Sequence, residues 1–145
     1  MIKKNFIIFL LLFVSFSSYS KSHKVEMLNR QERSLMIFSP AFLKIEVGDS
    51  ITFLPSTKGH IPRSVFTPKG AETWEMKGDK EVVVKFEKEG VYIFECKNHY
   101  AMGMVGVIQV GKAKNLLEAK KFAEVHKKKI SMNKERLEEY LKLVK

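Results

Sequence analysis

One short segment of this sequence contains several side chains that bind soft metal ions. The segment reads Phe94-Glu95-Cys96-Lys97-Asn98-His99-Tyr100-Ala101-Met102-Gly103-Met104. It supplies a thiol, an imidazole and thioethers, and a second imidazole lies upstream at His60. Sulfur ligands together with imidazole select copper, and a trigonal His2Cys set with a long axial Met is typical of a blue-copper electron-transfer site. The spacing Cys-x2-His-x4-Met, with an upstream His, therefore predicts a copper site.

Each of these residues alone has an ordinary structural role. A single Cys is usually a small buried hydrophobe, and Met102 and Met104 could fill gaps in a core. A Cys and His pair acting as a nucleophile needs a third orienting group, which this loop does not supply. Structural zinc sites use four strong ligands, and catalytic zinc sites keep one position open for water. The combination of Cys96, His99 and His60 favours copper over these alternatives, and we expect no catalytic residues and no enzyme activity.

The N-terminus predicts export. Two lysines precede an unbroken apolar run over residues 6–14, and Ser18-Tyr19-Ser20 follows. This is the pattern of a secretory signal peptide over residues 1–20, with cleavage before Lys21. The alternative, a membrane anchor, needs about 20 apolar residues, and this run is half as long. Export places the chain in an oxidising compartment, where its single Cys has no partner for an intramolecular disulfide.

The ligand loops need a scaffold, and the sequence predicts one that is mainly β. Between Lys24 and Val110, short β-branched and aromatic runs alternate with Gly, Pro, Asp and Ser. We predict strands over residues 25–29, 35–38, 42–47, 50–54, 81–86, 91–95 and 105–110. Many short strands with little helix between them favour a Greek-key sandwich or barrel over βαβ units.

A helical tail follows the predicted strands. Beyond Gly111 the sequence is rich in Lys and Glu, with apolar faces at Leu116, Ala119, Phe122 and Ala123, and then at Leu137, Tyr140, Leu141 and Val144. The second set has the i, i+3, i+4, i+7 spacing of an amphipathic helix. Both apolar faces need a partner surface, so we expect two helices over residues 112–145 to pack on the β domain. His23 and His126 lie among polar residues, and we expect both to be solvated.

The chain after residue 20 resembles the pseudoazurins, which are small periplasmic cupredoxins. The resemblance rests on the two C-terminal helices and on Val25-Glu26-Met27-Leu28-Asn29, residues 42–49, Lys58-Gly59-His60, Pro68-Lys69-Gly70-Ala71-Glu72 and His99-Tyr100-Ala101-Met102-Gly103-Met104. It implies a mainly β, cupredoxin-like Greek-key sandwich with two C-terminal helices packed on it. The organisation would be a signal peptide over 1–20, a copper-binding domain over 21–111 and a helical extension of that domain over 112–145.

The resemblance also implies the ligand set and the function. By the family pattern, one type 1 copper is bound by His60, Cys96, His99 and Met104, and Met102 is not a ligand. The implied function is one-electron transfer in the periplasm by a monomer. The implied partners are redox proteins, with a copper-containing nitrite reductase as the best-known type and a cytochrome as another.

Two positions depart from the family pattern. Ile61 stands where the family has an Asn directly after the first ligand His, and that Asn ties the ligand loops together. Asn98 stands where a Pro is common, two residues after the ligand Cys, and this change affects hydrogen bonding to the sulfur. Neither departure removes a ligand.

The charge of the chain predicts the kind of partner. Its 26 Lys and Arg against 16 Asp and Glu give a formal net charge of +10. We expect an acidic redox partner, no nucleic acid, and no membrane insertion after cleavage. His99 would be the electron port, with a small apolar rim at Ala101, Met102 and Gly103. Several lysines could surround this port and steer an acidic partner towards it, namely Lys58, Lys69, Lys77, Lys80 and Lys97.

Two other functions would use the same features. A copper storage or delivery module needs the same soft ligands, but it favours exposed and exchangeable Met and His side chains. An exported helical interaction protein would use the basic tail, but it leaves the ligand loop unexplained. A buried Cys with one axial Met favours a permanently held redox metal, so electron transfer is the main prediction.

Overall fold

The structure is a computed structural model, and it describes residues 19–145. The expected signal peptide over residues 1–20 therefore lies outside the described residues, except for its last two positions. Within residues 19–145, no helix has the length and apolar character needed to cross a membrane.

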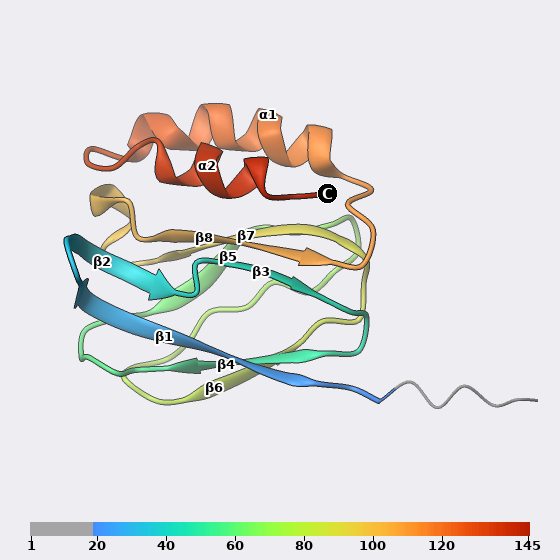
Figure 1. The fold of residues 1–145 in the computed structure, drawn as a ribbon, viewed down its shortest axis with the longest axis horizontal. Coiled ribbons are helices and arrows are strands. Elements are labelled where there is room, and N and C mark those ends of the chain that lie inside the picture. The colour runs from blue at the N-terminus through green and yellow to red at the C-terminus, as the bar shows by residue number, and fades with distance from the viewer. Residues whose placement is uncertain (1–18) are drawn as a thin grey trace, which may run out of the picture.

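Two four-stranded sheets face each other (Figure 1). The first sheet has the order β2 (Ser34–Ser39), β1 (Ser22–Gln31), β4 (Ser50–Leu54) and β6 (Val82–Lys85). The second has the order β3 (Phe42–Ile45), β8 (Val105–Val110), β7 (Gly90–Cys96) and β5 (Pro62–Phe66). From β2 to β7 consecutive strands alternate between the two sheets, so the chain crosses repeatedly between them. Strand β1 pairs in parallel with β4, and β3 with β8. The prediction of a mainly β sandwich is confirmed.

Several predicted strands differ from the observed strands, and β1 extends well beyond the expected residues 25–29 at both ends. Strand β5 was not predicted, because Pro62 and the polar pair Arg63-Ser64 interrupt any apolar alternation. The strand expected over 42–47 ends at Ile45, since a turn follows in which Gly48 has a φ of 93°. The strand expected over 81–86 is shorter and spans Val82–Lys85.

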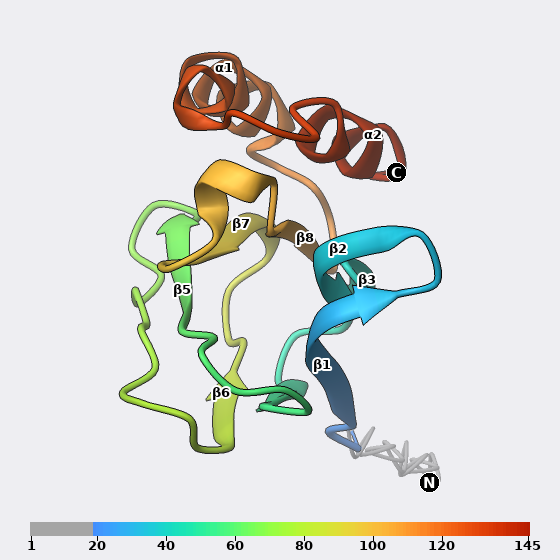
Figure 2. The same cartoon turned by 90° about the vertical axis from the view of Figure 1, so that its left-hand side faces the viewer.

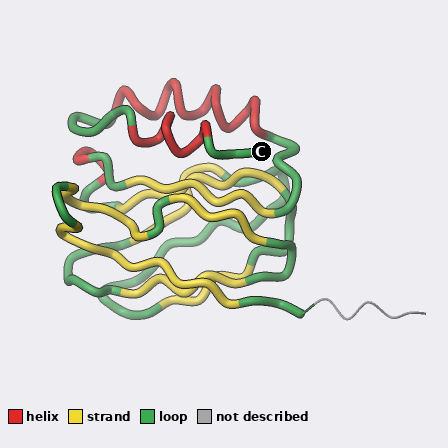
Figure 3. The backbone as a smooth tube through the Cα atoms, viewed as in Figure 1, coloured by secondary structure: helices red, strands yellow, loops and turns green. Residues whose placement is uncertain are grey.

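Two helices cover the outer face of the second sheet, as expected. Helix α1 (Leu116–His126) and helix α2 (Arg136–Lys142) lie beside each other over β7 and β8 (Figures 1 and 2). In Figure 3 they form a separate red layer next to the yellow strands. Their apolar faces pack on Val91, Ile93, Val105 and Val107 in a second core, which is distinct from the core between the sheets.

Strand β7 separates these two cores and is buried along its whole length. Because side chains alternate along a strand, Tyr92, Phe94 and Cys96 belong to the core between the sheets. Val91 and Ile93 belong to the core beneath the helices. This alternation directs Cys96 into the end of the sandwich and leaves Glu95, the residue before it, on the side of the helices.

Candidate metal centre

Two imidazoles and a thiol meet at one end of the sandwich. His60 lies in the loop before β5, Cys96 ends β7, and His99 lies in the loop between β7 and β8. The Nδ1 atoms of His60 and His99 are 3.2 Å apart, and the Cys96 Sγ atom lies 3.8 Å and 3.5 Å from them, respectively. Three ligands bound to one ion at about 2.0–2.3 Å, with angles of about 105–120° between them, would be separated from one another by about 3.2–3.8 Å. The observed separations therefore fit three donors around one metal ion.

His60 is held in the orientation and tautomer that a ligand needs. It is fully buried, and its Nε2 atom lies 3.1 Å from Thr57 Oγ1 and 3.0 Å from Asn29 Oδ1. If the Nε2–H group donates to Asn29 Oδ1, Nδ1 carries no hydrogen and can bind a metal. Ligand histidines commonly donate their other ring N–H to a partner of this kind. Burial and the neighbouring His99 both lower the pKa of His60, which favours the neutral form that a metal binds.

Hydrogen bonds join the two ligand loops across the site. The backbone N–H of Lys97 donates to the Ile61 carbonyl over 2.8 Å. The side-chain amide of Asn98 donates to the Gly59 carbonyl over 2.9 Å. Asn98, in the loop of Cys96, thus joins the two ligand loops. Ile61, in the loop of His60, stands where the family has an Asn, and its side chain has no hydrogen-bonding group.

The two methionines of the loop have different environments. Met104 is fully buried in the core between the sheets. Its carbonyl accepts from the Cys96 N–H over 2.9 Å, and its N–H donates to the His99 carbonyl over 3.3 Å. Met102 is half-buried in the short 3-10 helix η1 (Tyr100–Met102). Met104 is therefore bonded through its backbone to both ligands of this loop, while Met102 lies nearer the surface.

The predicted apolar rim is smaller than expected. His99, Ala101 and Met102 are half-buried, which leaves part of each accessible at the end of the sandwich. The prediction for Gly103 was wrong, since Gly103 is buried against the segment that joins the two helices. Met132, from that segment, is 49% exposed.

Four of the five predicted lysines lie near the site, and the prediction for Lys69 was wrong. Lys58 lies two residues before His60. The Gly59 N–H donates to Asp79, and this bond places the segment that contains Lys77 and Lys80 beside the loop of His60. The residues flanking Lys69 pack against Lys88 and Gly90, at the end of β7 opposite to Cys96. Lys69 is exposed at the far end of the molecule because β5 runs antiparallel to β7.

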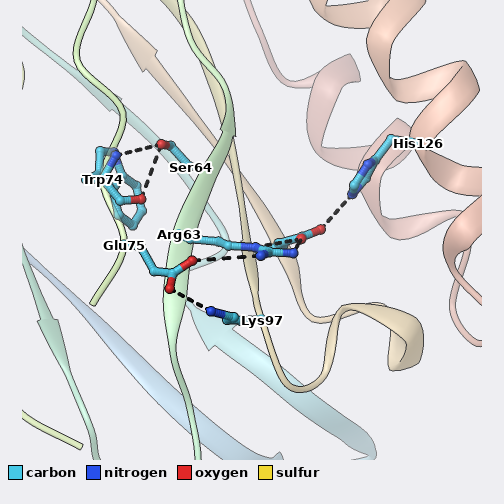
Figure 4. Close-up of polar contacts among 7 residues, drawn as sticks. Arg63, Ser64, Trp74, Glu75, Lys97 and His126 are labelled. Atoms are coloured by element: carbon cyan, nitrogen blue, oxygen red, sulfur yellow. Dashed lines mark hydrogen bonds and ion pairs between the residues drawn. The ribbon is translucent and has the colours of Figure 1, made fainter. Parts of the chain in front are cut away.

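Lys97 belongs to a polar chain that leads from the site to the helices (Figure 4). Its Nζ atom lies 2.8 Å from Glu75 Oε1, and Glu75 also faces Arg63. Arg63 donates to Glu95 Oε1 through Nη2 over 2.7 Å, and His126 Nε2 lies 2.6 Å from the other oxygen of Glu95. Burial raises the pKa of Glu95, but the hydrogen bonds from His126 and Arg63 outweigh this and hold the pKa below its ordinary value.

The expectation that His126 is solvated was wrong. His126 is 7% exposed, stacks on Phe122, and bonds Glu95. The Lys-rich sequence around it conceals that it ends the buried face of α1. His23 is also bonded, because its Nε2 atom lies 2.9 Å from Asp49, although part of its ring remains exposed. Glu95 lies within the strand predicted over residues 91–95, and a carboxylate at this position was a signal that hydrogen-bonding partners had to exist for it.

A β-sandwich with a thiol and two imidazoles gathered at one end defines a cupredoxin, as predicted. A profile described as copper binding proteins of the plastocyanin/azurin family matches residues 25–111. Pseudoazurin from Methylorubrum extorquens is 44% identical over 105 residues, which cover 71% of this chain and 71% of that protein. Pseudoazurin from Paracoccus pantotrophus is 37% identical over 120 residues, covering 81% and 83%, respectively.

Solved structures agree with these relatives. The crystal structure of native pseudoazurin from Hyphomicrobium denitrificans matches with a TM-score of 0.77 and 38% identity, covering 86% of this chain and 98% of that chain. The chain therefore belongs to the pseudoazurins, within the plastocyanin/azurin family of copper-binding proteins.

Proposed function

We propose that this protein carries single electrons on one type 1 copper bound by His60, Cys96, His99 and Met104. The observation that carries the proposal is the meeting of His60 Nδ1, His99 Nδ1 and Cys96 Sγ within 3.8 Å of one another. The burial of Met104, and the bond that its carbonyl accepts from the Cys96 N–H, support it over Met102 as the fourth ligand.

The chain's own residues supply the rigidity that electron transfer requires. Copper contributes a one-electron change of oxidation state. Thr57 and Asn29 hold the His60 ring, and the bonds of Lys97 and Asn98 hold the two ligand loops together. Ligands fixed in this way move little when the charge of the site changes. His99, which is half-buried, would be the route by which an electron leaves or enters.

The finer points of the proposal concern location and partners. Residues 1–20 would be a signal peptide, 21–111 the copper-binding domain and 112–145 an extension of it. The mature protein would work in the periplasm as a monomer and would not be an enzyme. A redox protein with an acidic docking surface would be the partner, and a copper-containing nitrite reductase is the type that the family resemblance implies.

A copper storage or delivery role fits the site less well. Such a role favours exposed ligands that exchange, whereas His60, Cys96 and Met104 are all fully buried. Copper in this site should therefore exchange slowly with a chelator.

The test is the visible spectrum of the copper-loaded protein. We expect an intense blue charge-transfer band from the thiolate, and we expect the colour to disappear on reduction. Cys96→Ala should abolish the band, and His60→Ala or His99→Ala should weaken or distort it, because the band arises from a thiolate in a trigonal ligand field. His23→Ala, which removes an imidazole outside the site, is the matched control. A colourless Cu(II) protein, or an unchanged band in Cys96→Ala, would exclude the proposal.

A further inference from the structure

The segment that joins α1 to α2 is bonded directly to the metal-ligand loop. The Ala101 carbonyl accepts from the N–H of Ser131 over 2.8 Å and from the N–H of Met132 over 3.1 Å. The Met102 carbonyl accepts from the side-chain amide of Asn133 over 3.0 Å. The Gly103 carbonyl accepts from Arg136 Nη1 over 3.2 Å. Three consecutive carbonyls, directly before Met104, are thus bonded by the helical extension.

The two segments also fit closely in space. A Cβ atom on Gly103 would lie 2.6 Å from the Met132 carbonyl oxygen and 2.8 Å from Asn133 Cβ. Gly103 also has a φ of 80°, a conformation that glycine adopts without strain. The loop can pass beneath the extension only because this position has no side chain.

Arg136 is the most unusual member of this contact. Its side chain reaches across to a second element, since Nη1 lies 3.1 Å from the Leu35 carbonyl and 3.0 Å from the Met36 carbonyl in β2. Arg136 is 8% exposed, and none of the ion pairs within residues 19–145 includes it. A nearly buried charge without a counter-ion is costly unless several acceptors surround it. Here three backbone carbonyls, from β2 and from the ligand loop, take that role.

We propose that the helical extension is part of the metal centre, with Arg136 and Asn133 as positioning residues for Met104. Their bonds to the carbonyls of Met102 and Gly103 fix the backbone directly before Met104. This backbone position would limit the distance between the Met104 sulfur and the metal. The long axial bond is the weakest of the four, so its length depends most on the backbone that carries it. The inference rests on the copper site proposed above.

The sharpest variant is Asn133→Gly. Asn133 has a φ of 52°, so glycine accepts its backbone conformation, and the substitution removes the side-chain donor together with the Cβ atom beside Gly103. Arg136→Met removes a larger donor together with its charge, and Arg136→Lys returns the charge and one donor. Lys121→Met is the matched control, because Lys121 is an exposed cation on the same helical layer.

Two measurements separate positioning from simple loss of stability. In the metal-free protein, amide hydrogen exchange at Gly103 and Met104 should become about tenfold faster in Arg136→Met and about threefold faster in Asn133→Gly. In the copper-loaded protein, both variants should change the visible and EPR spectra and the reduction potential. Arg136→Lys should restore part of each change, and Lys121→Met should resemble the parent protein.

The outcomes distinguish this inference from the proposed function. Parent-like exchange together with parent-like spectra in Asn133→Gly and Arg136→Met would overturn it, and Asn133→Gly decides alone if Arg136→Met does not fold. A parent protein that binds copper without a blue colour would instead overturn the proposed function. In that case, exchange in the metal-free protein would still show whether the extension holds the loop.

Discussion

At the scale of single residues, the site separates side chains that look alike in the sequence. Met102 and Met104 are two positions apart, yet one is half-buried in η1 and the other is fully buried beside Cys96. His60 and His99 present the same ring atom to the thiol, but only His60 is fully buried. The buried members hold the site, and the half-buried members form its accessible side.

The ligand assignment can be tested by exchanging each methionine for leucine. Met104→Leu should keep copper, because the axial bond is long and weak, but it should shift the reduction potential. We expect at least a tenfold change in the equilibrium between oxidised and reduced protein, which is about 60 mV for one electron. Met102→Leu is the matched control and should leave the potential nearly unchanged. The reverse result, measured by voltammetry, would make Met102 the ligand.

The sequence predicted the metal-binding residues of the site better than the residues that hold the ligand loops in place. Cys96, His99 and His60 could be recognised because soft ligands at this spacing have few other uses. Asn98 and Arg136 could not, because their role depends on which backbone carbonyls the fold brings near them. Their own neighbours in the sequence show only a polar residue in a loop and a charge at the start of an amphipathic helix.

At the scale of elements, one buried carboxylate, Asp49, joins the start of β1 to the turn before β4, at the end of the sandwich opposite to the metal site. Asp49 lies in the turn before β4 and is 3% exposed. Its two oxygens accept from the N–H of Lys21 over 2.8 Å and from the N–H of Glu46 over 3.1 Å, and His23 bonds it as well. The turn is thereby tied to the start of β1.

Asp49 should make the stability of the fold sensitive to acid. Burial raises the pKa of Asp49, but the bonds from Lys21, His23 and Glu46 outweigh it, and the pKa lies below 3.8. A carboxylate with a lowered pKa in the folded protein stabilises the fold above the unfolded value, and this contribution is lost as the pH falls through the folded value. The loss should therefore occur below about pH 3.8.

Asp49→Asn should remove that contribution at every pH. We expect the free energy of unfolding at pH 7 to fall by about 1–3 kcal/mol, because the N–H groups of Lys21 and Glu46 lose a charged acceptor. Below about pH 3.8 the variant should lose less stability than the parent on further acidification. Urea unfolding of the metal-free protein across this range is the measurement, with Glu118→Gln, an exposed carboxylate, as the control. Equal acid sensitivity in Asp49→Asn and the parent would contradict the assignment.

One strand could not be predicted from the apolar pattern of the sequence. Seven strands follow from apolar runs between turns, whereas β5 contains Pro62 and Arg63 and forms because it pairs with β7. That pairing brings the loop of His60 to the loop of Cys96, so the element that the sequence concealed is the one that assembles the metal site.

At the scale of the whole molecule, positive charge is spread unevenly relative to the site. Lys58, Lys77 and Lys80 lie near the loop of His60, whereas Lys69 lies at the opposite end. Lys97 is nearest to Cys96 in sequence, but Glu75 neutralises part of its charge. The lysines that can steer a partner to the copper end are therefore a subset of those that the sequence suggested.

Electron transfer with an acidic redox protein should slow as salt is added. Screening shortens the reach of exposed charges to about 8 Å at physiological ionic strength. Lys58→Glu should slow the bimolecular rate several-fold at low salt without changing the colour or the potential, because steering affects encounter and not the site. Lys69→Glu makes the same change of charge at the far end and should have a much smaller effect. Stopped-flow rates that do not depend on salt, or equal effects of the two variants, would assign recognition to the apolar surface around His99 alone.

The bond between Lys21 and Asp49 also bears on the proposed removal of a leader before Lys21. While a leader is attached, the Lys21 nitrogen is an amide and brings no charge. Removal of the leader before Lys21 would convert it into an α-ammonium group, whose pKa is ordinarily about 8, placed 2.8 Å from a nearly buried carboxylate. The bond is charge-assisted in both forms because the acceptor is a carboxylate, and an α-ammonium group would add the attraction between opposite charges. The position of cleavage would then decide whether an ion pair holds the start of β1 to Asp49. Cleavage further upstream would leave Asp49 bonded to a neutral amide.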